Sequence, residues 1–222
     1  MKKNILFFAA VVLLAACNSQ KKAGASSSSN ANSSNNGEWV SLFDGKSLDG
    51  WKESEGPSFS IENGAIKVAG KRSHLYYDGA VNNHVFKNFE VKAQVMTKPG
   101  SNSGFYFHTA FQPKGFPDKG FEVQVNNSHT DWKRTAGLYD IKDTSATFVK
   151  DDEWFELYIK VEGKHVVTKI NGQTITDWTE PEGAKPPEGH PARLISSGTF
   201  AIQAHDPKSI VYFKDIMVKP LP

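Results

Sequence analysis

The sequence contains a single cysteine, Cys17, so no disulfide can form within the chain, and a hydrophobic core must stabilise its folded part. It also lacks a membrane-spanning run: the apolar stretch ILFFAAVVLL has ten residues, whereas a spanning helix needs about 20. Charge of one sign is not in excess, with 26 Lys and Arg against 24 Asp and Glu. This balance argues against general affinity for nucleic acid, which normally needs a basic surface.

Familiar catalytic and metal-binding motifs are missing as well. The sequence has no H-E-x-x-H, cysteine cluster, calcium loop, G-x-S-x-G or phosphate-cradling glycine loop. We therefore expect no cofactor. A divalent metal held by dispersed groups stays an alternative that spacing does not support; its ligands would be His108, Glu122, Asp140 and His205.

The N-terminal segment has the features of an export signal. Lys2 and Lys3 precede the apolar run, and small residues lead to Cys17 in LAAC. This arrangement resembles a bacterial lipoprotein signal, which predicts a signal peptide at 1–16, lipidation of Cys17 and a protein anchored in the cell envelope. An ordinary secretory signal is the alternative. Residues 17–37 are rich in Ser and Asn and predict a flexible tether, which leaves 38–222 as one domain.

Apolar residues in this domain recur with period two, which predicts an all-β fold of two packed antiparallel sheets. NFEVKAQVM is a clear example, with Phe89, Val91, Ala93 and Val95 alternating against polar residues. Tight hairpin turns are predicted at Asn63-Gly64, Glu162-Gly163 and Asn171-Gly172. The Pro-rich segment 179–193 predicts a long loop of the functional or mobile kind. Four tryptophans beside apolar strand positions are expected in the core: Trp39, Trp51, Trp154 and Trp178.

Three predicted strands carry polar residues where side chains should point away from the core. In GFEVQVNNSH, Glu122 and Gln124 oppose Phe121, Val123 and Val125. The corresponding residues of SGFYFHTA and FAIQAHD are Tyr106, His108, Gln203 and His205. If these strands share a sheet, its outer face gathers the amides, carboxylate and rings of a polyol-binding site.

A solvated strand face is polar by default, and Glu90, Lys92 and Gln94 form such a face on NFEVKAQVM. The set above differs because it lacks lysine and contains histidines that titrate near neutral pH. Trp132, in the polar loop after the Glu122 strand, either stacks on a sugar ring or packs on its own loop.

Six segments, taken together, resemble the 3-keto-disaccharide hydrolase family. They are WVSLFDGKSLDGWK, FEVKAQVMTKPGSNSGFYFH, GFEVQVNN, AGLYDI, WFELYIKVEGKHVVTKINGQTITDW and GTFAIQAHDPKSIVYFKDIMVKPL, in that order, and the resemblance extends over nearly all of 38–222. The resemblance implies a concanavalin A-like jelly roll, action on 3-keto-glycosides and functional coupling to a sugar 3-oxidoreductase. It also implies acid/base roles for Glu122 and His205, with Asn102, Gln124 and Tyr139 orienting the sugar or stabilising an enolate.

The implied reaction makes physical sense. A carbonyl at C3 acidifies the C2 proton and places the C1 substituent in the β position, so elimination followed by water addition gives net hydrolysis. This route needs neither a covalent nucleophile nor the paired carboxylates of ordinary glycosidases. Glu122 would need a pKa raised by burial to act as an acid.

Two departures from the family's pattern leave the exact reaction open. His108 stands where many relatives have arginine, and the last motif is QAHDP in place of Asp-His-Gly. The loss of a fixed positive charge leaves hydrolase, lyase and hydratase as alternatives. A carbohydrate-binding envelope lipoprotein without catalysis is the competing class, and a structural lipoprotein is a third.

Overall fold

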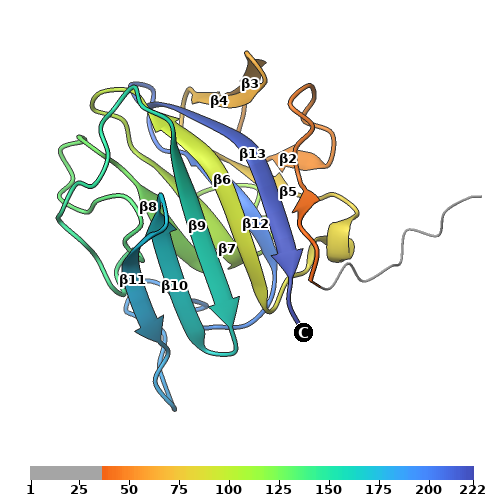
Figure 1. Cartoon of the computed structure of the whole chain (residues 1–222), viewed down its shortest axis with the longest axis vertical. Helices are drawn as coiled ribbons and strands as arrows, with labels where there is room; N and C mark the ends of the chain where they lie inside the picture. The colour runs from red at the N-terminus through yellow and green to blue at the C-terminus, as the bar shows by residue number, and fades with distance from the viewer. Residues whose placement is uncertain (1–36) are drawn as a thin grey trace, which may run out of the picture. The chain divides into compact units, whose positions relative to one another are not determined.

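The computed structural model describes residues 37–222, which form two antiparallel sheets packed face to face (Figure 1). The larger sheet has the order β11 (Gln173–Thr179), β10 (His165–Ile170), β9 (Phe155–Glu162), β6 (Phe89–Thr97), β13 (Ile210–Pro220), β4 (Ala65–Ala69) and β3 (Phe59–Glu62), with β1 (Val40–Ser41) paired to β13. The smaller sheet has the order β2 (Trp51–Glu53), β5 (Ser73–Tyr77), β12 (Thr199–Ala204), β7 (Ser103–Thr109) and β8 (Phe121–Val125). In this part of the chain the short 3-10 turn η1 (Val81–His84) is the one helical element, so the predicted all-β sandwich is confirmed.

The predicted signal peptide, Cys17 and all but the last residue of the predicted tether lie outside the described residues. Among residues 37–222, no helix has the length and apolar character needed to cross a bilayer.

The space between the sheets is filled by the apolar residues of the period-two pattern. On β6, Phe89, Val91, Ala93 and Val95 are each at most 3% exposed, as predicted. Phe200 of β12 lies at the centre of an aromatic cluster, with its ring centroid 4.6 Å from that of Phe86 and 4.9 Å from that of Phe89. Stacked and edge-to-face rings at these distances add to the stabilisation from burial.

Two of the predicted hairpins have the expected turn. Asn63 and Gly64 between β3 and β4 have φ of 51° and 77°, and Asn171 and Gly172 between β10 and β11 have φ of 47° and 82°. Asparagine and glycine tolerate this left-handed conformation, which matches the twist of the flanking strands. The third turn lies one residue later than predicted, because β9 continues through Glu162 and the loop is 163–164.

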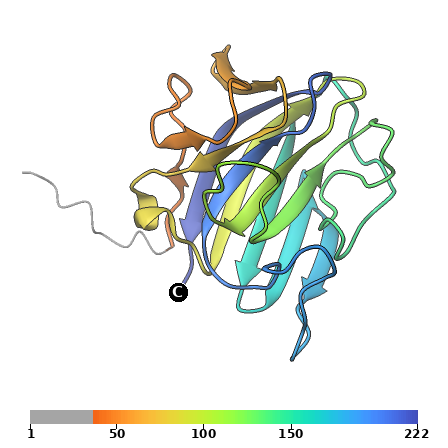
Figure 2. The ribbon, with the colours of Figure 1, turned by 180° about the vertical axis from the view of Figure 1, so that it is seen from behind.

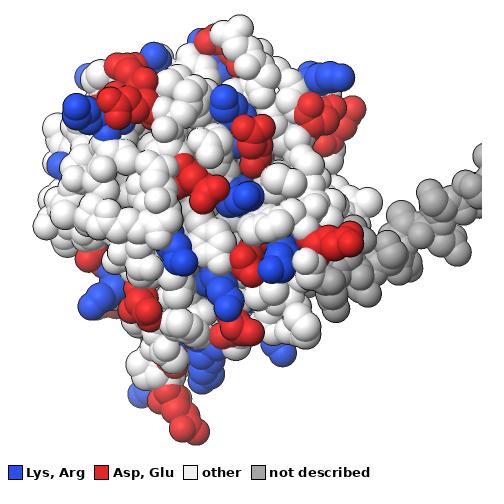
Figure 3. Space-filling model, viewed as in Figure 1, with Lys and Arg blue, Asp and Glu red and all other residues white. Residues whose placement is uncertain are grey.

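Acidic and basic side chains alternate over the outer face of the larger sheet (Figure 3). Lys92 lies there, 4.7 Å from the ring centroid of Trp39, and Lys214 lies 4.2 Å from that of Trp154. The expectation that these two tryptophans belong to the core is therefore wrong: Trp154, next to the buried Phe155, is 39% exposed and Trp39 is half-buried. Trp51 is buried, and Trp178 is half-buried against the core.

The aromatic cluster generates a stability prediction. We expect Phe200→Ala to lower the free energy of unfolding by about 3 to 5 kcal/mol, because it opens a cavity in a packed core. Phe148→Ala is the control, since Phe148 is 40% exposed and its loss should change stability by at most about 0.5 kcal/mol. Urea unfolding of both variants measures the difference, and equal effects would contradict the assignment of Phe200 to the core.

Candidate active site

The smaller sheet positions the polar residues that the sequence singled out. Figure 2 shows this sheet from its outer side, with loops crossing in front of it. Tyr106 of β7 and Glu122 of β8 are direct cross-strand partners, and β12 runs along the other side of β7. Phe105, Phe121 and Val123 point into the core, so the intervening side chains face outward. Every residue of β8 is nevertheless at most 6% exposed, because loops cover the outer face as well.

The Glu122 carboxylate is held by two side chains of the same face. The hydroxyl of Tyr106 donates to its Oε2 over 2.6 Å, and Nε2 of Gln203 donates to its Oε1 over 3.1 Å. Nε2 of Gln203 also lies 2.8 Å from the hydroxyl oxygen of Tyr106, so the three groups form a closed triangle. These hydrogen bonds hold the carboxyl group of Glu122 in one position.

Burial dominates the electrostatics of this carboxyl. Desolvation raises the pKa of Glu122 to about 7, although the hydrogen bond from Tyr106 and the charge of Arg193 oppose the shift. The same burial, together with the adjacent carboxylate, raises the pKa of Tyr106 well above its usual value. Glu122 therefore has the raised pKa that a carboxyl needs in order to donate a proton near neutral pH.

Gly104 of β7 leaves the room that this arrangement needs. A Cβ atom at position 104 would lie 2.4 Å from Oε1 of Glu122, well inside van der Waals contact. A glycine is therefore required here for packing. Asn102, two residues before Gly104, accepts a hydrogen bond of 2.7 Å from Nε2 of Gln124 through its Oδ1.

Two buried amide oxygens at the site lack a hydrogen-bond partner within residues 37–222. They are Oε1 of Gln124 and Oε1 of Gln203, and both residues line the same cavity. A buried acceptor without a partner is costly. Hydroxyl groups of a bound sugar are donors that would satisfy both.

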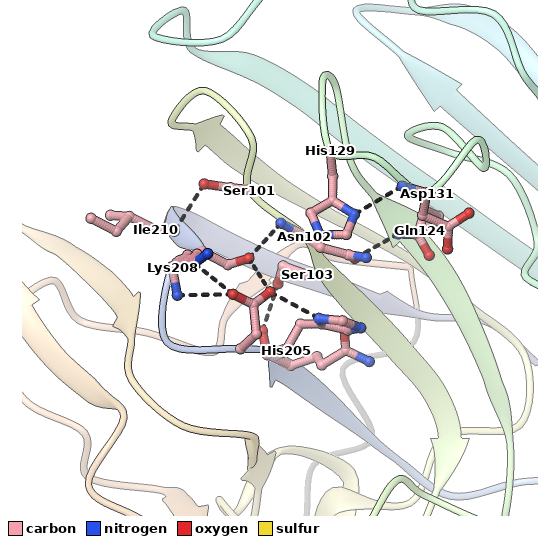
Figure 4. A network of polar contacts seen from close by, with 12 residues as sticks. Ser101, Asn102, Ser103, Gln124, His129, Asp131, His205, Lys208 and Ile210 are labelled. Carbon is pink, nitrogen blue, oxygen red and sulfur yellow. Dashed lines mark hydrogen bonds and ion pairs between the residues drawn. The ribbon is translucent and has the colours of Figure 1, made fainter.

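His205 lies just beyond the end of β12 (Figure 4). Its neighbour Asp206 orients the ring. Nδ1 of His205 is 3.0 Å from Oδ2 of Asp206, which also accepts 2.7 Å from the hydroxyl of Ser209. Partial burial acts against ionisation, but the hydrogen bonds from Ser209 and His205 lower the pKa of Asp206 to about 2. An ionised carboxylate only accepts, so Nδ1 carries the proton, and Nε2 is the nitrogen left for a substrate.

The cavity that joins these groups has a volume of about 270 Å³, close to the lower end of the range for small-molecule sites. It brings together seven of the residues singled out from the sequence: Asn102, Tyr106, Glu122, Gln124, Tyr139, Gln203 and His205. Loops add residues that the sequence analysis did not single out, including Phe116, Pro117, Asp131, His190 and Arg193, as well as Asp140, considered there only as a metal ligand.

Arg193 supplies a fixed positive charge to this cavity. It is 3% exposed and lies in the Pro-rich segment after β11, where the sequence predicted a long loop. Its Nη1 donates to the carbonyl of Tyr139 over 3.0 Å, while its buried Nε has no partner within the described residues. The cavity therefore contains a fixed positive charge, the loss of which the sequence analysis inferred from His108.

His108 and Trp132 are not part of the cavity lining, and the expectation that His108 faces the sugar is wrong. His108 has a φ of 55°, which interrupts the strand alternation and turns its ring against Phe89 and Phe107. Its Nε2 lies 2.8 Å from the carbonyl oxygen of Lys87, and burial lowers its pKa to about 4. Trp132 is 56% exposed beside the site.

Three of the four dispersed metal ligands considered above, Glu122, Asp140 and His205, line this cavity, but they do not converge on one point. Among residues 37–222, no group of three or more His, Cys, Asp and Glu side chains has an arrangement that could hold a metal ion. Asp140 instead pairs with Lys133, and its Oδ2 is 3.5 Å from Nε2 of His190.

Comparison with known proteins agrees with the fold and gives the family. Residues 38–219 match the model of the 3-keto-alpha-glucoside-1,2-lyase-like domain. The 3-keto-disaccharide hydrolase of Bacteroides thetaiotaomicron is 26% identical over an alignment of 173 residues that covers 64% of this chain and 60% of that protein. The chain thus spans less than two thirds of this curated relative.

Three solved structures share the fold. A candidate glycosyl hydrolase from Parabacteroides distasonis has a TM-score of 0.70 at 24% identity, covering 83% of this chain and 94% of that one. A Bacillus subtilis protein with a galectin-like fold has a TM-score of 0.62 at 11% identity, covering 82% and 94%. The carbohydrate binding module CBM66 from Bacillus subtilis has a TM-score of 0.55 at 12% identity, covering 77% and 95%.

These similarities identify the two sheets as a concanavalin A-like sandwich, as predicted. Because the family model matches nearly all of the described residues, the chain belongs to the family of 3-keto-alpha-glucoside-1,2-lyase-like domains.

Proposed function

We propose that this protein is an enzyme that cleaves 3-keto-glycosides by elimination and subsequent addition of water. The observation that carries the proposal is the buried Glu122, with a pKa of about 7, in one cavity with the Asp206-oriented His205. Family membership and the relative from Bacteroides thetaiotaomicron support a glycosyl hydrolase-like activity.

In this mechanism Nε2 of His205 removes the C2 proton, and the electron pair forms an enolate whose negative charge lies on the C3 oxygen. Arg193, the cation of the cavity, stabilises that charge. The enolate then expels the C1 oxygen, which takes the proton of Glu122. Water adds at C1 of the resulting unsaturated ketone while C2 regains a proton, so the products are the 3-keto sugar and the free alcohol.

The unoxidised parent glycoside distinguishes this route from ordinary hydrolysis. Asp131 and Asp140 also line the cavity, and a pair of carboxyl groups is the usual equipment of glycosidases. Without the C3 carbonyl the C2 proton is not acidic, so the proposed route cannot act on the parent sugar.

The substrate must come from a reaction that oxidises the C3 hydroxyl of a glycoside, so a sugar 3-oxidoreductase is part of the proposal. Lipidation at Cys17 and location in the cell envelope are proposed from the sequence alone.

We expect the protein to release alcohol from a chromogenic 3-keto-glucoside and not from its parent glucoside. Glu122→Gln and His205→Ala should each lower kcat/KM by about 10²- to 10⁴-fold, the usual contribution of an acid or base. Rates with and without EDTA test for a metal. Binding of the keto sugar without release would instead identify a carbohydrate-binding module.

Matched controls come from the larger sheet. His165→Ala breaks a His–Asp contact of 2.7 Å with Asp177, and Glu156→Gln removes a carboxylate of β9. Both variants should keep wild-type activity. Losses as large as those at Glu122 and His205 would show that the effects are not local.

The raised pKa of Glu122 predicts the pH dependence of activity. As the proton donor, Glu122 must be protonated, so kcat/KM should fall as the pH rises through about 7. If kcat/KM instead rose over the same pH range, Glu122 would act as the base.

Stability gives a second measure of the same pKa. Between its usual value of 4.5 and about 7 the folded state binds more protons than the unfolded state, so the free energy of unfolding should fall with rising pH. Glu122→Gln should lack this decrease when urea unfolding is compared at pH 5 and pH 8. An identical pH dependence in the variant would contradict the assigned pKa.

Gly104→Ala tests the position of the carboxyl group. The added methyl would meet Oε1 of Glu122, so the carboxyl must leave the triangle with Tyr106 and Gln203. We expect kcat/KM to fall at least about tenfold with unchanged circular dichroism, since a displacement of about 1 Å can be that costly. A wild-type rate would show that this placement does not matter.

A further inference from the structure

A second cavity lies on the outer side of the smaller sheet, next to the candidate active site. Its volume is about 280 Å³, close to that of the first, and it is lined by residues from β2, β5, β7, β12, η1 and the loops that connect them. Nothing in the mechanism above uses it.

The two cavities share their walls. The loop between β7 and β8 contributes Phe111 and Lys119 to the second cavity, and Phe116 and Pro117 to the first. The loop between β11 and β12 likewise contributes Ser197 to the second and Arg193 to the first. Beneath these loops Tyr76 and Tyr106, one from each cavity, belong to the same small cluster on the sheet. A ligand with two linked units could therefore occupy both cavities at once.

The charge of the second cavity is positive. Lys52 has no carboxylate partner within residues 37–222, and its Nζ lies 3.9 Å from the ring centroid of Phe111. Lys119 donates 2.7 Å to the carbonyl of Ser197, which uses one of the three donors of an ammonium group. Asp78 is the one acidic lining residue, and its Oδ1 lies 3.8 Å from Nδ1 of His84.

Apolar and hydroxyl groups complete the lining. Phe111 and Val85 are 41% and 48% exposed, although large apolar side chains are usually covered. The buried hydroxyl of Thr109 has no hydrogen-bond partner within the described part of the chain.

We propose that the second cavity binds an acidic sugar unit of the substrate, through a carboxylate or sulfate group held by Lys52 and Lys119. The apolar face of the sugar ring packs on Val85 and the exposed part of Phe111, and a ring hydroxyl reaches Thr109. That the ligand is a sugar rests on the proposed function; that it is an anion rests on the two ammonium groups. The substrate class is then a glycoside whose unit next to the cleaved one carries negative charge.

The test is NMR titration of the full chain with glucuronate, glucose 6-sulfate, inorganic sulfate and glucose at 0.15 M NaCl. We expect at least one acidic sugar to bind at least tenfold more tightly than glucose and inorganic sulfate, and more weakly as salt is added. The two acidic sugars show which anionic group is preferred. Equal binding of glucose, tighter binding of inorganic sulfate or no binding of either acidic sugar would overturn the proposal.

Variants locate the binding. Lys52→Gln and Lys119→Gln should each weaken binding of the acidic sugar at least fivefold. Lys214→Gln is the matched control, because Lys214 also lies over an aromatic ring but on the larger sheet. Glu122→Gln, in the first cavity, should leave the affinity unchanged. Weaker binding of the acidic sugar by the Lys214 or Glu122 variant would overturn the assignment. Unchanged binding by the Lys52 and Lys119 variants would do so too.

This binding is measured without turnover, so the two proposals fail separately. Acidic-sugar binding that depends on Lys52 and Lys119 supports the site even if no 3-keto-glycoside is cleaved. Cleavage without such binding leaves the proposed function standing and removes the second site.

Discussion

Burial of the Glu122 carboxyl is the constraint on which the rest of the site depends. An ionised carboxylate without water is costly, and a protein can reduce that cost by supplying donors or by keeping the group protonated. Here both occur, since Tyr106 and Gln203 donate to a carboxyl whose pKa is about 7. The same constraint excludes a side chain at position 104, where a Cβ atom would strike the carboxyl.

The sandwich provides this burial without placing the carboxyl in the core. Because side chains alternate along β8, Phe121 and Val123 lie between the sheets, whereas Glu122 lies on the outer face, where loops cover it. Strands hold the acid and its partners, whereas loops bring Arg193 and Tyr139. Groups that must keep a fixed geometry therefore lie on the rigid element, and groups that shape the cavity lie on segments that can vary without changing the fold.

The same division explains what could be predicted from the sequence. Tyr106, Glu122, Gln124 and Gln203 were found because alternation along a strand is a local rule, and antiparallel pairing brings such faces together. His108 was misplaced because its positive φ breaks that rule within one residue, and nothing in the local sequence marks it. Arg193 was missed because its approach to Glu122 depends on the path of a loop, which no periodicity encodes.

A single carboxyl with a raised pKa fits elimination better than ordinary glycoside hydrolysis. Hydrolysis of an unactivated glycoside needs a second carboxylate to supply a nucleophile or activate water. Of the other acids in the cavity, Asp140 is paired with Lys133, and Asp131 accepts a hydrogen bond from a backbone N–H through its Oδ1. With a ketone at C3 the reaction needs a base in place of the second carboxylate, because the C3 carbonyl of the substrate accepts the electron pair of the C2–H bond. His205, fixed by an ionised Asp206, has the chemistry of such a base, so the residue set fits the oxidised substrate that we propose.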